Sequence, residues 1–150
     1  MPNNTGDHAE AAFIHHAHRH LDSVEIFTPM THRTKVDVAV RKPGFPLVGV
    51  QVKKATQQRK KCGAFSESWK FLVGSGQSWN NHKANEGKPR LTRYVDGDFD
   101  IIACFIMELN TWAFYRLDEL AGKATCRWSP TKGPLNNWEI FNEYFQTQNK

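Results

Sequence analysis

Two alternating segments joined by a turn constrain the fold of this chain most strongly. Residues 35–41 (KVDVAVR) and 47–54 (LVGVQVKK) place a valine at every second position, with mostly small or polar residues between them. Successive side chains of a strand point to opposite faces of a sheet, so this period predicts two strands that each bury one face. The intervening segment Lys42-Pro43-Gly44-Phe45-Pro46 is rich in residues that reverse the chain direction. The sequence therefore predicts two strands joined by a hairpin turn.

The polar positions of this hairpin converge if the turn is centred on Gly44. That register places Asp37 directly opposite Gln51, and Lys53 follows two positions later on the same face. The valines pack on the other face: Val36, Val38, Val40, Val48, Val50 and Val52. The turn contains two prolines, so a register shifted by one or two residues stays open.

The rest of the chain predicts a mixed sheet with a helix near each end of the sequence. Apolar residues recur every fourth position from Ala9 to Leu21, which is typical of an amphipathic helix over 7–21. Further strands are predicted at 24–28, 69–73, 100–107 and 111–117. A second helix over 137–145 carries an aromatic stripe of Trp138, Phe141, Tyr144 and Phe145. The predicted fold class is α/β, more specifically an α+β mixed sheet flanked by helices.

Length and composition favour one domain over residues 1–150. A chain of 150 residues with 39% hydrophobic content can bury about 70% of the surface that its unfolded form exposes. No apolar run reaches the roughly 20 residues of a membrane helix, and the first residues lack the pattern of a signal peptide. We therefore expect a cytoplasmic protein with no membrane partner. Its three scattered cysteines are expected to be reduced thiols.

The positive charge is concentrated in the middle of the chain. The net charge is +5, and residues 53–93 contain ten Lys and Arg against two acidic residues. Segments 54–68 and 74–93 show no hydrophobic period and are predicted to be loops, which are uncommonly long for a compact domain without a function for them. A basic stretch of this kind is typical of a protein that meets a polyanion. A solvated face with surplus lysines is the alternative.

The polar face of the hairpin has the donors of a divalent metal site. The Asp37 carboxylate, the Gln51 amide oxygen and the backbone carbonyl of Val52 are hard oxygen ligands of the kind that hold Mg²⁺. A lysine beside them, Lys53, can orient water and stabilise charge that develops on phosphorus. The alternative is a cross-strand salt bridge between Asp37 and Lys53 with Gln51 solvated.

The same residues resemble a nuclease superfamily. Glu10 on the first helix, Asp37 on a strand and Gln51-Val52-Lys53 on the next strand resemble the signature of the PD-(D/E)XK nucleases. Gly6-Asp7-His8-Ala9-Glu10 is similar to their first-helix motif, and Tyr94-x-x-Gly97-x-x-Asp100 is similar to a bacterial branch. The chain is most similar to the homing endonucleases of this fold that bacterial group I introns encode. The resemblance covers about the first 117 residues.

The resemblance implies a restriction-endonuclease-like core that hydrolyses phosphodiester bonds of double-stranded DNA at specific sites. It implies Mg²⁺ as the cofactor, with Mn²⁺ as a substitute, and a homo-oligomer with two or four subunits. The implied catalytic residues are Glu10, Asp37, Gln51 and Lys53, and the implied metal ligands are Glu10, Asp37, Gln51 and Val52. Two positions depart from the family pattern: Val36 replaces the usual proline, and Gln51 replaces the usual glutamate. The second change removes a negative charge, which Glu10 would partly restore.

DNA recognition is predicted from the polar segments inserted at about 54–93. Arg pairs with guanine and Gln with adenine in the major groove, whereas Lys mainly contacts phosphate. Base readout is expected chiefly from residues 57–61. The predicted DNA-binding residues are Lys54, Gln57, Gln58, Arg59, Lys60, Lys61, Lys83, Lys88, Arg90 and Arg93.

Several alternatives remain at the level of sequence. A Holliday-junction resolvase, or a repair or restriction nuclease of the same fold, would use the same residues, and a catalytically silent DNA-binding protein would explain Gln51. The cluster His15, His16, His18 and His20 is interpreted as a polar helix face rather than a metal site, because no carboxylate follows at the required spacing. The aromatic stripe of the last helix is interpreted as core or as a contact between subunits, and the helix itself is predicted to form that contact.

Overall fold

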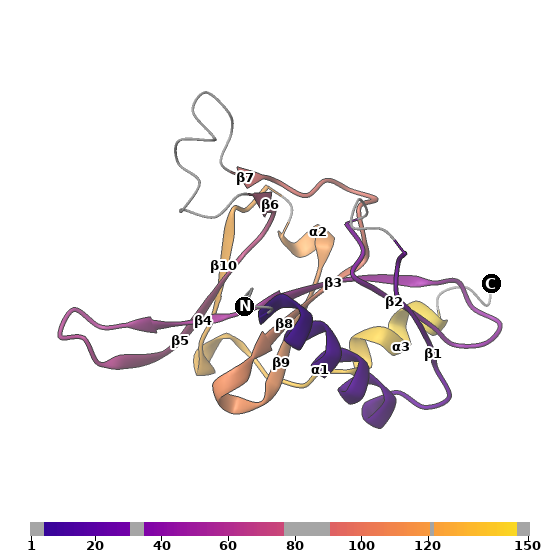
Figure 1. Cartoon of the computed structure of the whole chain (residues 1–150), viewed down its shortest axis with the longest axis horizontal. Coiled ribbons are helices and arrows are strands. Elements are labelled where there is room, and N and C mark those ends of the chain that lie inside the picture. Colours follow the sequence, from indigo (N-terminus) through magenta and orange to yellow (C-terminus); the bar gives the residue numbers. More distant parts are fainter. Residues whose placement is uncertain (1–4, 31–34, 77–90, 121, 147–150) are drawn as a thin grey trace.

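A central sheet of five strands organises the computed structural model, which describes residues 5–30, 35–76, 91–120 and 122–146. The strand order is β1-β2-β3-β8-β9. Strands β3 and β8 run parallel, and the other neighbours run antiparallel, which confirms the predicted mixed sheet (Figure 1). The strands are β1 (Glu25–Phe27), β2 (Val38–Arg41), β3 (Val48–Lys54), β8 (Ile101–Ile106) and β9 (Thr111–Arg116).

The β2–β3 hairpin has the register predicted from Gly44. Val38 pairs with Val50, and Val40 pairs with Val48. The Phe45 N–H donates to the Lys42 carbonyl at 3.0 Å, and Gly44 takes a φ of +91°. These features are those of a type II turn, in which proline precedes a residue with positive φ.

The predicted strand over 35–41 is correct only from Val38 onward. Val36 does not share the face of Val38 and Val40; it packs instead with the cluster on the opposite side of the sheet. The prediction for Val36 was wrong because the chain leaves regular strand geometry before Val38, so the two-residue alternation does not extend that far.

Two helices cover one face of the central sheet. Helix α1 (Thr5–His20) and helix α3 (Glu139–Gln146) pack onto the valines of β2 and β3. The predicted apolar stripe of α1 is confirmed, since Phe13 and Ala17 are fully buried. The aromatic stripe at α3 is also core, because Trp138, Phe141 and Phe145 are buried within the chain. Of the two alternatives for this stripe, the structure shows the core, and a contact between subunits through α3 stays a prediction.

The opposite face of the central sheet is covered by a second sheet of three strands in the order β10-β5-β4. Its strands are β4 (Thr56–Arg59), β5 (Phe65–Leu72) and β10 (Thr125–Trp128). Trp69, Phe71 and Trp128 point inward and pack with β8 residues such as Ile102. A short helix, α2 (Leu117–Leu120), packs in the same cluster.

The loop predicted over 54–68 is instead largely the β4–β5 hairpin. Its residues showed no hydrophobic period because half of the hairpin extends beyond the core, where neither face is buried (Figure 1). Strand β10 was not predicted either. The loop predicted over 74–93 holds a short pair, β6 (Ser75–Gly76) and β7 (Leu91–Thr92), while 77–90 lie outside the described residues. The described residues also include two 3₁₀ turns, η2 (Met107–Leu109) and η3 (Pro130–Lys132).

Two histidines of α1 pack against aromatic residues of the core. His16 Nδ1 accepts a hydrogen bond from the Trp112 indole N–H at 2.7 Å, and the His20 ring stacks on Trp138 at 5.0 Å. Within the described ranges, no three His, Cys, Asp or Glu side chains form a group that could hold a metal ion by themselves. The cysteines Cys62, Cys104 and Cys126 are all free. No helix in the described part of the chain is long and apolar enough to cross a membrane.

Candidate active site at the end of strand β3

Strand β3 extends beyond the end of its neighbour β2. Asp37 lies beside the edge of β3 that β2 leaves unpaired. The Asp37 N–H donates to the Val50 carbonyl at 2.9 Å, and the Asp37 carboxylate accepts the Val52 N–H at 2.8 Å. The side chain of Gln51 also hydrogen bonds to Asp37. The N–H and C=O of one strand residue point to the same side, so the Val52 carbonyl lies on the side of the carboxylate. The predicted opposition of Asp37 and Gln51 is confirmed.

Burial opposes the charge on the Asp37 carboxyl group. Burial raises the pKa of Asp37 above its usual range, whereas the Val52 N–H, the Lys53 ammonium and Gln51 act in the opposite direction. Asp37 is therefore a partly desolvated carboxyl group, and only a few neighbouring groups favour its ionised form. A divalent cation would favour its ionised form strongly.

Lys53 lies at the same end of β3 but is not paired with Asp37. Its Nζ donates to the Gly74 carbonyl at 3.0 Å and lies 5.3 Å from the centre of the Tyr94 ring. Burial lowers the pKa of Lys53, and the nearby Asp37 carboxylate only partly offsets this effect. Among the described residues no ion pair joins the two side chains, so the cross-strand salt bridge that the sequence left open does not form.

Tyr94 and Lys35 belong to the site although the sequence did not identify them as site residues. The buried Tyr94 ring has the Lys35 Nζ 5.5 Å from its centre, in addition to Lys53. Burial raises the pKa of the Tyr94 hydroxyl, and Asp37 adds to this effect. The Tyr94 ring thus makes cation–π contacts with two lysines, of which Lys53 also acts on the Asp37 carboxylate. The signal for Lys35 was its place two residues before Asp37; Tyr94 was noted only within a family motif.

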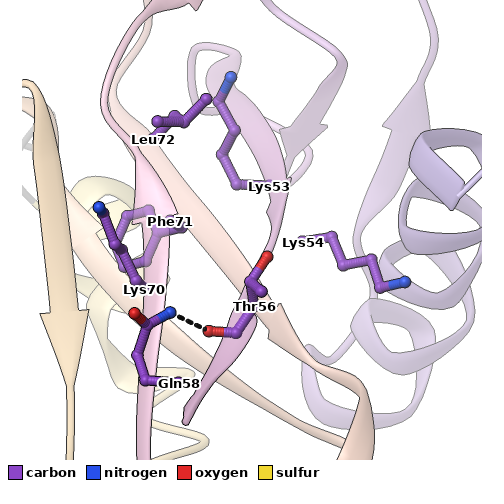
Figure 2. Close-up of a pocket in the computed structure, with 7 residues that line it drawn as sticks. All are labelled: Lys53, Lys54, Thr56, Gln58, Lys70, Phe71 and Leu72. Atoms are coloured by element: carbon purple, nitrogen blue, oxygen red, sulfur yellow. Dashed lines mark hydrogen bonds between the residues drawn. The ribbon is translucent and has the colours of Figure 1, made fainter. Parts of the chain in front are cut away.

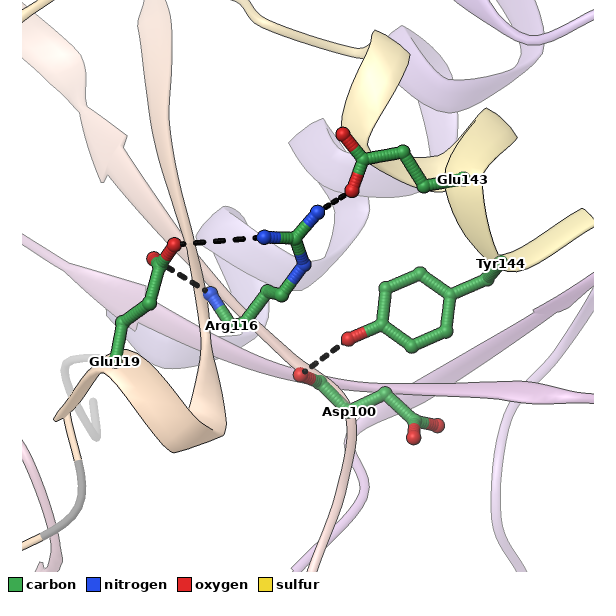
Figure 3. A network of polar contacts seen from close by, with 5 residues as sticks. All are labelled: Asp100, Arg116, Glu119, Glu143 and Tyr144. Atoms are coloured by element: carbon green, nitrogen blue, oxygen red, sulfur yellow. Dashed lines mark hydrogen bonds and ion pairs between the residues drawn. The ribbon is translucent and has the colours of Figure 1, made fainter. Parts of the chain in front are cut away.

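Asp100 holds the beginning of β8 against β3. Its carboxylate accepts the Gly49 N–H at 2.8 Å, and its own N–H donates to the Gly49 carbonyl at 2.9 Å. Its carbonyl accepts the Tyr144 hydroxyl at 3.2 Å (Figure 3) and the Leu117 N–H at 3.0 Å. These contacts set the β3–β8 register two residues before Gln51, so they position the strand that carries the site.

Arg116 connects α3 to the same region of the sheet. Its guanidinium pairs with Glu119 at 3.6 Å and with Glu143 of α3 (Figure 3). Gly49 allows a close approach of Val36, because a Cβ at position 49 would lie 3.0 Å from the Val36 side chain and would push it aside. The close approach of Val36 to Gly49 brings the segment before β2 against β3, which places Asp37.

A cavity of about 490 Å³ opens beside Lys53, between β3 and the second sheet. Its lining side chains include three lysines and no acidic residue (Figure 2): Lys53, Lys54, Thr56, Gln58, Lys70, Phe71 and Leu72. Lys54 is exposed, whereas Lys53 is half-buried. The cavity thus joins the candidate site to a positively charged surface.

The structure places only some of the predicted DNA-binding residues close to one another. Gln57, Gln58 and Arg59 lie on β4 and hydrogen bond within the hairpin, to the carbonyls of Ser66, Thr56 and Gly63 respectively. Lys60 and Lys61 are exposed at the turn of the hairpin, and Arg93 is exposed after β7. Lys83, Lys88 and Arg90 lie outside the described residues. The outer end of the hairpin is therefore separate from the end of β3, whereas Gln58 lines the same cavity as Lys53.

The donor set at the end of β3 fits a hard divalent cation. It combines a carboxylate, an amide oxygen and a backbone carbonyl, from Asp37, Gln51 and Val52, and such oxygens suit Mg²⁺ alongside water and phosphate. Glu10 lies half-buried on α1, and α1 packs against β3. This set of ligands carries little negative charge, because Gln51 contributes an amide and not a carboxylate.

Comparison with known proteins supports this interpretation at the level of fold. No protein-family model matches the sequence, and no curated protein sequence matches it. Among solved structures, a bacterial homing endonuclease, I-Ssp6803I, superposes with a TM-score of 0.73 over 97% of this chain and 95% of that chain, at 17% sequence identity. The chain therefore has the α+β fold of a bacterial homing endonuclease, with a mixed central sheet.

Proposed function

We propose that this protein is a Mg²⁺-dependent endonuclease that cuts double-stranded DNA at specific sites, as a homing endonuclease of the PD-(D/E)XK type. One observation carries the proposal. The Asp37 carboxylate and the Gln51 amide meet beside the Val52 backbone, with Lys53 two residues further along the same strand. The fold shared with a homing endonuclease adds to this argument.

Each residue of the site has a role that its chemistry suits. Asp37, Gln51 and the Val52 carbonyl would hold Mg²⁺ or Mn²⁺, with Glu10 supplying further negative charge from α1. The metal, when bound, polarises the scissile phosphate and lowers the pKa of a coordinated water. Lys53 donates hydrogen bonds where negative charge develops on the phosphate oxygens and orients the attacking water. Because Lys53 is partly buried, its charge acts through a medium of low dielectric constant and is more effective than in water.

The β4–β5 hairpin would read the DNA. Pairing between β10 and β5 ends at Trp69, so residues 65–68 have only β4 as a described neighbour and form a two-stranded ribbon (Figure 1). A ribbon of this width fits the major groove of duplex DNA. Arg59, Lys60 and Lys61 lie at its outer end. A double-strand break also needs two active sites, so we propose a homo-oligomer of at least two subunits.

A cleavage assay with a matched pair of variants tests the function. The purified protein is incubated with Mg²⁺, or with EDTA, and a pool of long linear duplexes or a four-way junction. Lys53→Met should lower the cleavage rate by about 10²–10³-fold, the usual effect of removing one group that stabilises the transition state. Lys42→Met, in the β2–β3 turn and exposed, should retain the cleavage rate within a few-fold.

The outcomes separate the alternative functions. Cleavage of duplexes that stops with EDTA and with Lys53→Met supports the proposal. Cleavage of the junction alone would favour a resolvase instead. Binding of duplexes without cleavage by the wild type under any divalent cation would identify a silent DNA-binding protein.

A further inference from the structure

A row of like charges crosses the second sheet. Lys70 of β5 lies directly opposite Arg127 of β10 on one side and Thr56 of β4 on the other. Directly opposed residues of neighbouring strands share one face of a sheet. The inward face belongs to Trp69, Phe71 and Trp128, so the row of Thr56, Lys70 and Arg127 faces outward.

The two opposed cations do not stabilise the sheet. Like charges placed directly opposite each other on neighbouring strands are destabilising. In the part of the chain that the structure describes, neither Lys70 nor Arg127 forms an ion pair with an acidic side chain. Binding of an anion from outside the protein therefore explains the placement of these two cations better than the stability of the fold does.

Two hollows extend the positive surface at the two ends of the row. The cavity that Lys70 lines reaches Lys53 at the candidate site (Figure 2). At the other end, Arg127 lines a second cavity of about 460 Å³ together with Lys123 and Lys132. The one acidic residue at that second cavity, Glu119, already pairs with Arg116. Positive side chains thus continue from the end of β3 to the far edge of β10.

We propose that this outward face, which we call the β5–β10 track, binds the sugar–phosphate backbone of duplex DNA as it leaves the candidate active site. The track consists of Lys70, Arg127, Lys123 and Lys132, with Thr56 beside Lys70. The proposal rests on the nuclease function proposed above and adds a second contact surface, separate from the outer end of the β4–β5 hairpin. Strands about 4.8 Å apart give the row a width of roughly 10 Å.

Salt dependence of DNA binding tests the track. The affinity of the full chain for a duplex is measured by fluorescence anisotropy at several salt concentrations, with Ca²⁺ in place of Mg²⁺ so that the DNA is not cut. Each phosphate contact contributes about 0.9 to the slope of log affinity against log salt. The double variant Lys70→Ala/Arg127→Ala should therefore lower the magnitude of this slope by about 1.8, and the exchanged pair Lys70→Arg/Arg127→Lys should restore it.

A matched control removes the same charge elsewhere. Arg19 at the end of α1 and Lys42 in the β2–β3 turn are both exposed, and the double variant Arg19→Ala/Lys42→Ala should leave the slope unchanged. The melting temperature provides a second readout, since removal of the opposed charges should not lower it. The proposed role of the β5–β10 track would be refuted by an unchanged slope for the Lys70→Ala/Arg127→Ala variant. An equal decrease of the slope in the control variant would also refute it.

The wild-type cleavage assay separates this proposal from the proposed function. If the wild type cuts duplexes while the Lys70/Arg127 variant keeps its slope, the track is wrong and the nuclease proposal stands. If the slope falls as expected but no DNA is cut, the track stands and the nuclease proposal fails. If the wild type binds no duplex, both proposals fail.

Discussion

The Asp37 carboxylate accepts a hydrogen bond from the Val52 N–H at 2.8 Å, where β3 extends past the first residue of β2. The contact substitutes a side chain for the strand partner that Val52 lacks on that edge. It also leaves the carboxylate on the side of the sheet edge to which the Val52 carbonyl points. The register of one hairpin therefore assembles two of the proposed metal ligands.

Asp37→Asn should abolish most cleavage without weakening DNA binding. The amide has the size of the carboxyl group and can still accept the Val52 N–H, but it carries no charge for the metal. We expect the single-turnover cleavage rate to fall by about 10²-fold or more. Duplex affinity, measured by anisotropy in Ca²⁺, should change by less than threefold. A variant that cuts at half the wild-type rate would remove Asp37 from the proposed mechanism.

Gln51→Glu should tighten Mg²⁺ binding. A unit negative charge about 4 Å from a divalent ion is worth up to about 8 kcal/mol at an effective dielectric constant of 20, twice the value for two unit charges. Loss of the Gln51 hydrogen bond to Asp37 and repulsion between the two carboxylates offset part of this gain. We expect the Mg²⁺ concentration for half-maximal cleavage to fall by roughly tenfold. Calorimetric titration of Mg²⁺ into the DNA-free protein should shift in the same direction, and weaker binding would contradict the ligand role of residue 51.

The pH dependence of cleavage should report on Lys53. Burial lowers the pKa of Lys53, so its charge is lost at a lower pH than that of an exposed lysine. If the charged form assists the reaction, the wild-type rate should decline on the alkaline side, below the usual lysine pKa. Lys53→Arg stays charged throughout this range, so a variant that retains activity should lack that decline. Equal alkaline declines in both proteins would show that another group titrates.

The ring of Tyr94 should matter more than its hydroxyl. Tyr94→Phe keeps an aromatic face for Lys35 and Lys53, whereas Tyr94→Leu removes it. A cation–π contact contributes about 0.5–2 kcal/mol, so Tyr94→Leu should reduce the cleavage rate by about 2- to 30-fold and Tyr94→Phe by less than twofold. In Tyr94→Leu the alkaline decline should also move to higher pH, because water reaches Lys53. Equal effects of the two substitutions would assign the role to the hydroxyl group.

Stability should decrease below neutral pH because of His16. Its Nδ1 accepts the Trp112 N–H, and burial, followed by the nearby His15, lowers the pKa of His16. The unfolded chain, with an ordinary histidine pKa of about 6.5, then binds more protons than the folded chain. The contribution of His16 is therefore complete above about pH 6.5 and is lost as the pH falls through the lower folded-state pKa.

Urea unfolding at pH 7.5 and pH 5.5 measures this effect. His16→Gln retains an acceptor for Trp112 but does not titrate, so its loss of unfolding free energy between the two pH values should be smaller than that of the wild type. The exposed His18 serves as the control, because His18→Gln should leave the wild-type pH dependence in place. Identical pH dependence of the wild type and His16→Gln would contradict the prediction.

Several elements could be predicted from sequence because their patterns are local. The β2–β3 register followed from Pro43-Gly44 and from the alternating valines, since turn chemistry and burial of one face act over a few residues. Helix α1 followed from its four-residue apolar repeat. Strand β4 could not be predicted, since its polar residues show no period where the hairpin extends away from the core. The burial of the aromatic residues at α3 was also not evident, because an apolar stripe does not reveal what covers it.

By itself, the sequence indicated Asp37, Gln51 and Lys53 as candidate site residues and predicted their relation across one hairpin. Only the tertiary structure decided what surrounds them. Tyr94 and Gly74 are more than 20 residues from Lys53 in the chain, and the opposition of Lys70 and Arg127 depends on the pairing of β5 with β10. Side-chain periodicity encodes the face on which a residue lies. It does not encode the partner across a distant strand, which depends on how the whole core packs.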